Sequence, residues 1–208
     1  MEIKILETAG LAPALHAMRN PMNSWNNSDS RWLYNDDDSK FKYEPGEKDK
    51  ALSEKLQQAG PEHSKHLRMI FVWADINSPR YWWTEFDTYR NGVEKISCST
   101  MHKLTAKPFE ESDFEIDSDE WRHDVTEYMN KRYKDWQEAA DEDEKKIRWR
   151  DMIQCLPQSY IQKRTVMMSY AALRNIVRQR KGHKLVEWAE FIEWARTLPE
   201  SWMIFDDL

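Results

Sequence analysis

The first half of the chain alternates short apolar stretches with polar breaks. Residues 1–6 have the alternation of a strand, and residues 8–18 form a short amphipathic stretch. Residues 46–60 carry leucines at helical spacing and end on a glycine, which predicts a helix followed by a glycine stop. The apolar run over 67–76 predicts a buried strand. A second helix is expected over 79–89, because a proline suits the first helical turn.

The second half is predicted to be mostly helical. An Asn-Gly turn at 91–92 and an acidic loop over 108–117 lead into it. From residue 118 large apolar side chains recur at spacings of three and four, namely Trp121, Val125, Tyr128, Met129, Tyr133 and Trp136. After a charged break at 141–146, helices are expected over 147–156, 160–180 and 183–198.

These elements indicate an α+β (mixed α/β) fold: a small mixed sheet flanked by long helices, with a helical C-terminal half. No internal repeat or linker divides the chain, so a single domain over residues 1–208 is expected. The composition agrees, with 40% hydrophobic and 33% charged residues and 5 Gly, because this balance is typical of a compact helix-rich chain. Most of the 11 Trp are expected to serve core and subunit packing.

Charge and cysteine usage narrow the range of functions. A formal charge of −6 disfavours direct nucleic-acid binding, which calls for a basic face. The 2 Cys, Cys98 and Cys155, form neither a disulfide framework nor a CxxC pair. No apolar run is long enough for a membrane span and no secretory signal is evident, so the cytoplasm is the expected location.

Common catalytic motifs are missing from the sequence. None of the 6 His belongs to an HExxH helix or to a Cys/His zinc spacing, so no metal site is expected. The sequence also lacks a GxxxxGK[ST] loop, a GxGxxG turn and a GxSxG elbow.

The order of several segments carries more information. Residues 55–63 end in Gly-Pro-Glu-His, the strand over 69–76 leads into Ser78-Pro79, and a polar stretch follows over 88–101. Farther on, residues 169–180 form a helix-like stretch ending on Arg180, and His183 begins the run HKLVE. This succession resembles the flavin-dependent thymidylate synthase (ThyX) family. There a Gly-His-rich turn, a strand and a Pro-led helix precede the motif RHRxxSxNxxSxRY, and a helix NLRSLxxFLxLR precedes HAQxE.

The polar stretch departs strongly from the family motif. Of its fixed letters only one arginine survives, as Arg90. Tyr89 replaces the motif His, and Cys98 stands where the second motif Ser is expected. The resemblance is to a diverged subfamily of this family, found in phages and their bacterial hosts.

The resemblance implies a function. It is the reductive methylation of dUMP to dTMP with FAD as cofactor and with NADPH and methylenetetrahydrofolate as co-substrates, in a homotetramer. The implied catalytic residue is Arg180, which would also contact the uracil. The implied cofactor-binding residues are His63, Tyr89, Arg90 and His183. The implied substrate-binding residues, besides Arg180, are Lys95, Ser97, Cys98, Ser99 and Thr100.

Two other readings stay open. The same scaffold could modify another pyrimidine nucleotide, for example by hydroxymethylation. It could also be a non-catalytic nucleotide- or partner-binding protein of phage origin, with the acidic segments 117–121 and 205–208 as contact surfaces. Arginine is the stronger phosphate partner because its fork is planar and bidentate. Arg174 and Arg178, four residues apart, suit either such a role or a solvated helix face.

Overall fold

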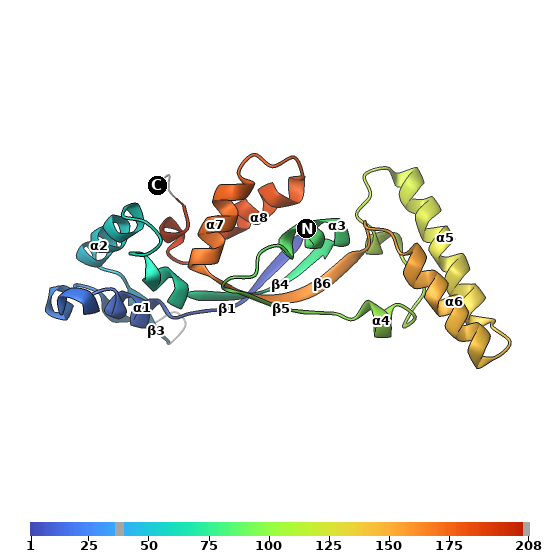
Figure 1. Ribbon diagram of the computed structural model, residues 1–208, viewed down its shortest axis with the longest axis horizontal. Coiled ribbons are helices and arrows are strands. Elements are labelled where there is room, and N and C mark those ends of the chain that lie inside the picture. The colour runs from blue at the N-terminus through green and yellow to red at the C-terminus, as the bar shows by residue number, and fades with distance from the viewer. Residues whose placement is uncertain (36–39, 206–208) are drawn as a thin grey trace. The chain divides into compact units, whose positions relative to one another are not determined.

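The structure is a computed structural model that describes residues 1–35 and 40–205 (Figure 1). The chain divides into two compact units. Unit 1 consists of Met1–Lys4, Asp75–Tyr89 and Lys95–Thr165, and unit 2 of Ile5–Ala74, Arg90–Glu94 and Val166–Leu208. The single domain over 1–208 stays a prediction, and residues 206–208 of the acidic tail lie outside the described part.

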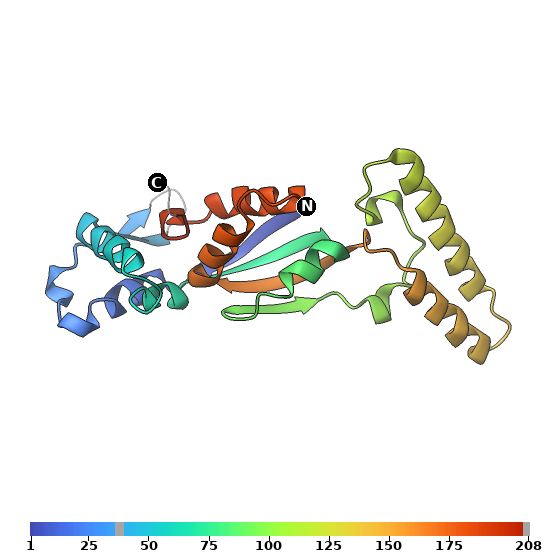
Figure 2. The ribbon, with the colours of Figure 1, turned by 45° about the horizontal axis from the view of Figure 1, so that its top comes forward.

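The strands of a four-stranded sheet have residues in both units, and Figure 2 shows this sheet. Its strand order is β1-β4-β6-β5, formed by β1 (Glu2–Ala9), β4 (Phe71–Pro79), β6 (Ile161–Ser169) and β5 (Val93–Ser97). In unit 1 the Arg80 amide donates to the Tyr160 carbonyl, and in unit 2 the Tyr170 amide donates to the Ile70 carbonyl. One partner number rises as the other falls, so β4 and β6 run antiparallel. The expected α+β class is confirmed.

The expectation of one continuous helix over 160–180 is wrong. The segment is strand β6 followed by helix α7 (Tyr170–Arg180). Burial alternates toward the end of the strand, where Val166 and Met168 are buried, and this period of two belongs to a strand. The hydroxyl of Ser169 then accepts from the Ala172 amide at 3.2 Å, which starts the helix.

The described residues of unit 1 form four helices, and the sequence did not indicate the second of them. They are α3 (Arg80–Phe86), α4 (Thr100–Lys103), α5 (Asp119–Gln137) and α6 (Glu142–Cys155), with a 3-10 turn η4 (Glu111–Asp113). Helices α5 and α6 lie side by side (Figure 1). The charged break expected over 141–146 is wrong beyond Asp141, because helix α6 already begins at Glu142. The Asp141 carboxylate caps it by accepting from the amides of Asp143 and Glu144.

Two apolar clusters fill unit 1. One joins α5 and α6 to the loop before them and consists of Leu104, Phe109, Phe114, Met129, Tyr133, Met152 and Leu156. In the other, Trp82, Trp83 and Phe86 of α3 are fully buried and their rings contact one another. The Trp83 indole N–H donates to the Gln162 carbonyl at 2.9 Å. Core packing therefore accounts for these two tryptophans.

Unit 2 contains helices α1 (Leu11–Ala17), α2 (Glu47–Gln58), α7 and α8 (Val186–Arg196). Its 3-10 turns are η1 (Asn20–Met22), η2 (Trp25–Asn27), η3 (Lys65–Met69) and η5 (Ser201–Met203). The sequence did not indicate its antiparallel hairpin, β2 (Arg31–Asn35) and β3 (Lys40–Glu44). No helix in the described part of the chain is both long and apolar enough to cross a membrane.

A buried ion pair connects α2 to the N-terminal segment of unit 2. The Asp49 carboxylate, 1% exposed, accepts from the Arg19 guanidinium at 2.5 Å and from the hydroxyls of Ser28 and Ser30. Because its lone pairs are used by several donors, the buried charge is compensated.

Candidate functional site

Unit 2 holds a cavity of about 730 Å³. Its walls come from the end of α2 with the turn that follows, η3, the start of β4, the turn at 91–92 and helix α7. The lining residues are Gln57, Gly60, Pro61, Ser64, Leu67, Arg68, Phe71, Asn91, Gly92, Ser169, Ala171, Ala172, Arg174, Asn175 and Arg178.

The first turn of α7 forms one wall of this cavity because a glycine lets the neighbouring turn approach closely. Gly92 has φ +71°, and a Cβ placed there would lie 2.5 Å from the Ser169 hydroxyl oxygen. The Ser169 amide donates to the Gly92 carbonyl at 2.8 Å. Ala171 and Ala172, at the start of α7, line the cavity. A helix N-terminus carries a partial positive charge and attracts anions.

Three arginines add positive charge to the same cavity. The Arg174 guanidinium donates to the backbone carbonyls of Met203 and Phe205 at 3.3 and 3.4 Å, which holds it in place. Arg178 follows one turn later on α7. Arg68 faces the cavity from η3 and donates to the Pro61 carbonyl at 3.3 Å. This arrangement suits phosphate groups, because guanidinium forks bind phosphate oxygens in pairs.

A buried polar chain lies behind the α2 wall. The Gln57 amide nitrogen donates to the Ser53 hydroxyl at 3.1 Å, and that hydroxyl lies 2.7 Å from His66 Nε2. Ser53 and His66 are 0% and 3% exposed. Burial lowers the pKa of His66 from 6.5 to about 4, so its imidazole is neutral at pH 7.

Comparison with known proteins identifies the fold. No family model matches the chain, and no curated protein matches it. A crystal structure of flavin-dependent thymidylate synthase ThyX from Helicobacter pylori complexed with FAD and dUMP is similar, with a TM-score of 0.72 and 19% identity over 100% of both chains. A second Helicobacter pylori ThyX structure with FAD and dUMP has a TM-score of 0.73 and 18% identity, covering 100% of this chain and 98% of that one.

The chain has the ThyX fold. The resemblance carried by segment order is therefore confirmed at the level of fold. Roles for individual residues do not follow from a likeness at this identity, and they rest on the site itself.

Four of the predicted site residues lie in unit 2 of the ThyX fold. His63 is exposed in the turn after α2, and Arg90 is exposed beside the lining residue Asn91. Arg180 and His183 meet at the end of α7, where the Arg180 guanidinium lies 4.4 Å and the His183 ring 6.2 Å from the Trp188 ring. None of these four lines the cavity, so their roles stay predictions.

Predicted residues near β5 belong to unit 1. Tyr89 packs on Phe86 with ring centroids 6.2 Å apart. The Lys95 ammonium forms an ion pair with Asp87 at 2.8 Å and lies 5.5 Å above the same Phe86 ring. Ser97 is exposed at the end of β5. These contacts give Lys95 and Tyr89 partners within the protein, and their ligand roles stay predictions.

The remaining three predicted residues gather in a smaller hollow of unit 1. Cys98, Ser99 and Thr100 line this space of about 290 Å³ together with Tyr160. Ser99 caps α4 by accepting from the His102 amide at 3.3 Å. The predicted substrate segment thus provides a thiol and two hydroxyls around one small hollow.

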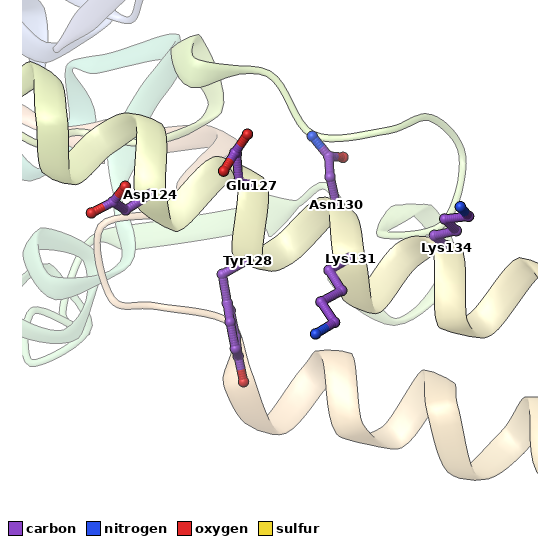
Figure 3. A pocket seen from close by; sticks show the side chains of 6 residues that line it. All are labelled: Asp124, Glu127, Tyr128, Asn130, Lys131 and Lys134. Carbon is purple, nitrogen blue, oxygen red and sulfur yellow. The ribbon is translucent and has the colours of Figure 1, made fainter.

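A third hollow, of about 770 Å³, lies along α5 (Figure 3). Every residue lining it comes from that single helix: Asp124, Glu127, Tyr128, Asn130, Lys131 and Lys134. Tyr128 extends toward α6, where its hydroxyl contacts the Cys155 sulfur at 3.3 Å. One exposed helix face of mixed charge encloses no ligand, so the cavity of unit 2 is the better candidate.

Sequence reasoning missed three important residues of that cavity and its surroundings: Gln57, Arg68 and His66. The turn after α2 suggested His63, whereas the structure exposes His63 and buries His66. The apolar neighbour Leu67, also buried, was the available signal for burial at this point. Across the described residues, no group of three or more His, Cys, Asp or Glu side chains is arranged to hold a metal ion.

Proposed function

We propose that this protein is a ThyX-type enzyme that uses FAD to methylate dUMP to dTMP reductively, with methylenetetrahydrofolate and NADPH as co-substrates. The observation that carries the proposal is the cavity of unit 2, where three arginines and the start of α7 face one space in a ThyX fold. The two similar structures are complexes with FAD and dUMP, which directs the proposal to this pair of ligands.

The residues present fit a flavin nucleotide. A pyrophosphate needs fixed cations and N–H donors, which the guanidinium groups of Arg68 and Arg174 supply, and the N-terminal end of α7 adds its partial positive charge. Phe71 offers an apolar ring beside them. The volume of about 730 Å³ falls in the range of known ligand sites, roughly 300–1,000 Å³.

The protein's own contribution is binding and orientation. The flavin, when bound, supplies the hydride chemistry. The arginines would anchor phosphate groups, and the carbonyls of Met203 and Phe205 hold the Arg174 guanidinium in position for that task. Neutral His66 lies behind the wall and supplies no charge to the cavity at pH 7.

Visible absorption of the purified protein tests the cofactor. We expect a flavin band, or FAD binding on titration, and an Arg178→Gln variant with weaker FAD affinity. Arg150→Gln, an equal change of charge on exposed α6, is the matched control and should bind as the parent does. A colourless protein that does not bind added FAD contradicts the proposal. Loss of the C5 label from labelled dUMP then measures the reaction.

The rewritten motif supports a second candidate, the modification of another pyrimidine nucleotide on the same scaffold. Cys98, Ser99 and Thr100 replace the family pattern there and line their own hollow. A panel of pyrimidine nucleotides, each assayed for exchange at C5, separates the two candidates. Binding of FAD without turnover of any nucleotide would favour a non-catalytic role.

The proposal also covers the oligomeric state, the cellular location and the subfamily of the protein. The homotetramer is proposed because large apolar side chains remain exposed, including Trp32 at 59% and Ile96 at 79%. The measured mass in solution tests it. The cytoplasmic location and the phage or bacterial subfamily stay predictions.

A further inference from the structure

One polar side chain in the cavity wall is more deeply buried than most of the others. Gln57 is only 8% exposed, yet it lines the cavity at the end of α2. A buried amide needs partners for both its N–H and its carbonyl groups, because an unpaired buried polar group is costly.

The nitrogen end of this amide is already held inside the protein. Its Nε2 donates to the Ser53 hydroxyl at 3.1 Å, and that hydroxyl lies 2.7 Å from His66 Nε2. An amide nitrogen only donates, so the Ser53 hydroxyl accepts from Gln57 while it also contacts the neutral imidazole. The Gln57 amide nitrogen is therefore held by Ser53, which in turn contacts His66, and both of these side chains are buried.

The oxygen end is not held in this way. Among residues 1–35 and 40–205, no group donates a hydrogen bond to the side-chain carbonyl oxygen of Gln57. This oxygen is not completely enclosed by protein atoms. Since Gln57 lines the cavity, that oxygen is left to accept from whatever occupies it. An acceptor fixed in this way favours a ligand with an N–H at the facing position and disfavours one without it.

We propose, on the basis of the proposed function, that Gln57 is a specificity-determining residue whose carbonyl oxygen accepts the ring imide N3–H of a bound ligand. Uracil and the isoalloxazine ring of a flavin share this imide. Ser53 and His66 are positioning residues, since they act through the orientation of Gln57.

The test compares each parent ligand with its N3-methylated form, which has no imide hydrogen. Affinities of the full-length protein are measured by titration for FAD against N3-methyl-FAD and for dUMP against N3-methyl-dUMP. The pair that shows discrimination identifies which ring Gln57 contacts. We expect the parent protein to disfavour one methylated ligand by about 10-fold or more.

Gln57→Ala should bring the ratio of the affinities for the parent and the N3-methylated ligand close to one. The acceptor is gone in this variant, and the methyl group gains space. Gln58→Ala is the matched control, since Gln58 is the next residue on α2 and is exposed, and it should keep the full ratio. Ser53→Ala should partly lower the ratio of the affinities for the parent and the methylated ligand, and it should affect the affinity for the parent ligand less. Loss of folding would instead abolish the binding of both ligands.

Two kinds of result overturn the inference. If the parent protein binds methylated and unmethylated ligands equally, or if Gln57→Ala keeps the discrimination, Gln57 does not contact the imide. In both cases the parent ligands still bind, so the proposed function survives. If neither FAD nor dUMP binds the parent protein, both proposals fail together.

Discussion

Acidification should destabilise this protein through His66. Its folded pKa of about 4 lies below the ordinary value of 6.5, so between these values the unfolded chain binds the proton and the folded chain does not. The contribution is therefore fully present above pH 6.5 and is lost as the pH falls toward 4. The difference in pKa converts to about 3 kcal/mol of unfolding free energy.

The assay is urea unfolding at pH 7 and at pH 4.5, for the parent protein and for His66→Gln. Glutamine does not titrate, so the variant should lose less stability between the two pH values, by about 2–3 kcal/mol. His63→Gln, an exposed histidine in the preceding turn, should behave as the parent does. Equal losses in parent and His66→Gln would refute the reasoning that burial keeps this imidazole neutral.

Three further changes probe unit 2. Gly92→Ala should cost about 1–3 kcal/mol in thermal unfolding, because φ is +71° and the new Cβ meets the Ser169 hydroxyl; an unchanged melting temperature would contradict it. Asp49→Asn should cost about 3–5 kcal/mol in urea unfolding, since Arg19 then keeps a buried charge without its counter-ion; a loss below 1 kcal/mol would mean the charge is solvated. Arg68→Gln should weaken FAD binding about 10-fold without changing stability, and equal affinity by titration would remove Arg68 from the site.

The fold could be predicted to a large extent because periodicity reports local structure. Helices α2 and α5 were indicated by their apolar spacing, and β4 by a continuous apolar run. Strand β6 was missed, since Ile161–Ser169 continues into a helix without a glycine or proline. Strand β6 pairs with β4, which lies about 90 residues earlier in the chain. A short stretch of sequence does not reveal hydrogen bonds to so distant a strand.

The site could be predicted less well. A motif assigns roles by position along the chain, whereas the cavity combines α2, η3, the turn at 91–92 and α7. Arg174 and Arg178 were recognised as a helix-face pair, and only folding shows that both line a cavity. Similarly, His63 and His66 are only three residues apart, and only the folded structure shows that His66 is buried and His63 exposed.

The helical hairpin α5–α6 has a topological consequence. The chain leaves β5 and returns in β6, and these strands are neighbours in the sheet. The hairpin and its own apolar cluster are thus one long insertion with both ends at adjacent strands. Closing a loop costs only about 0.6 kcal/mol more for each doubling of its length. Helical turns can therefore be gained or lost here over generations with little penalty to sheet closure, which makes this segment tolerant of changes in length.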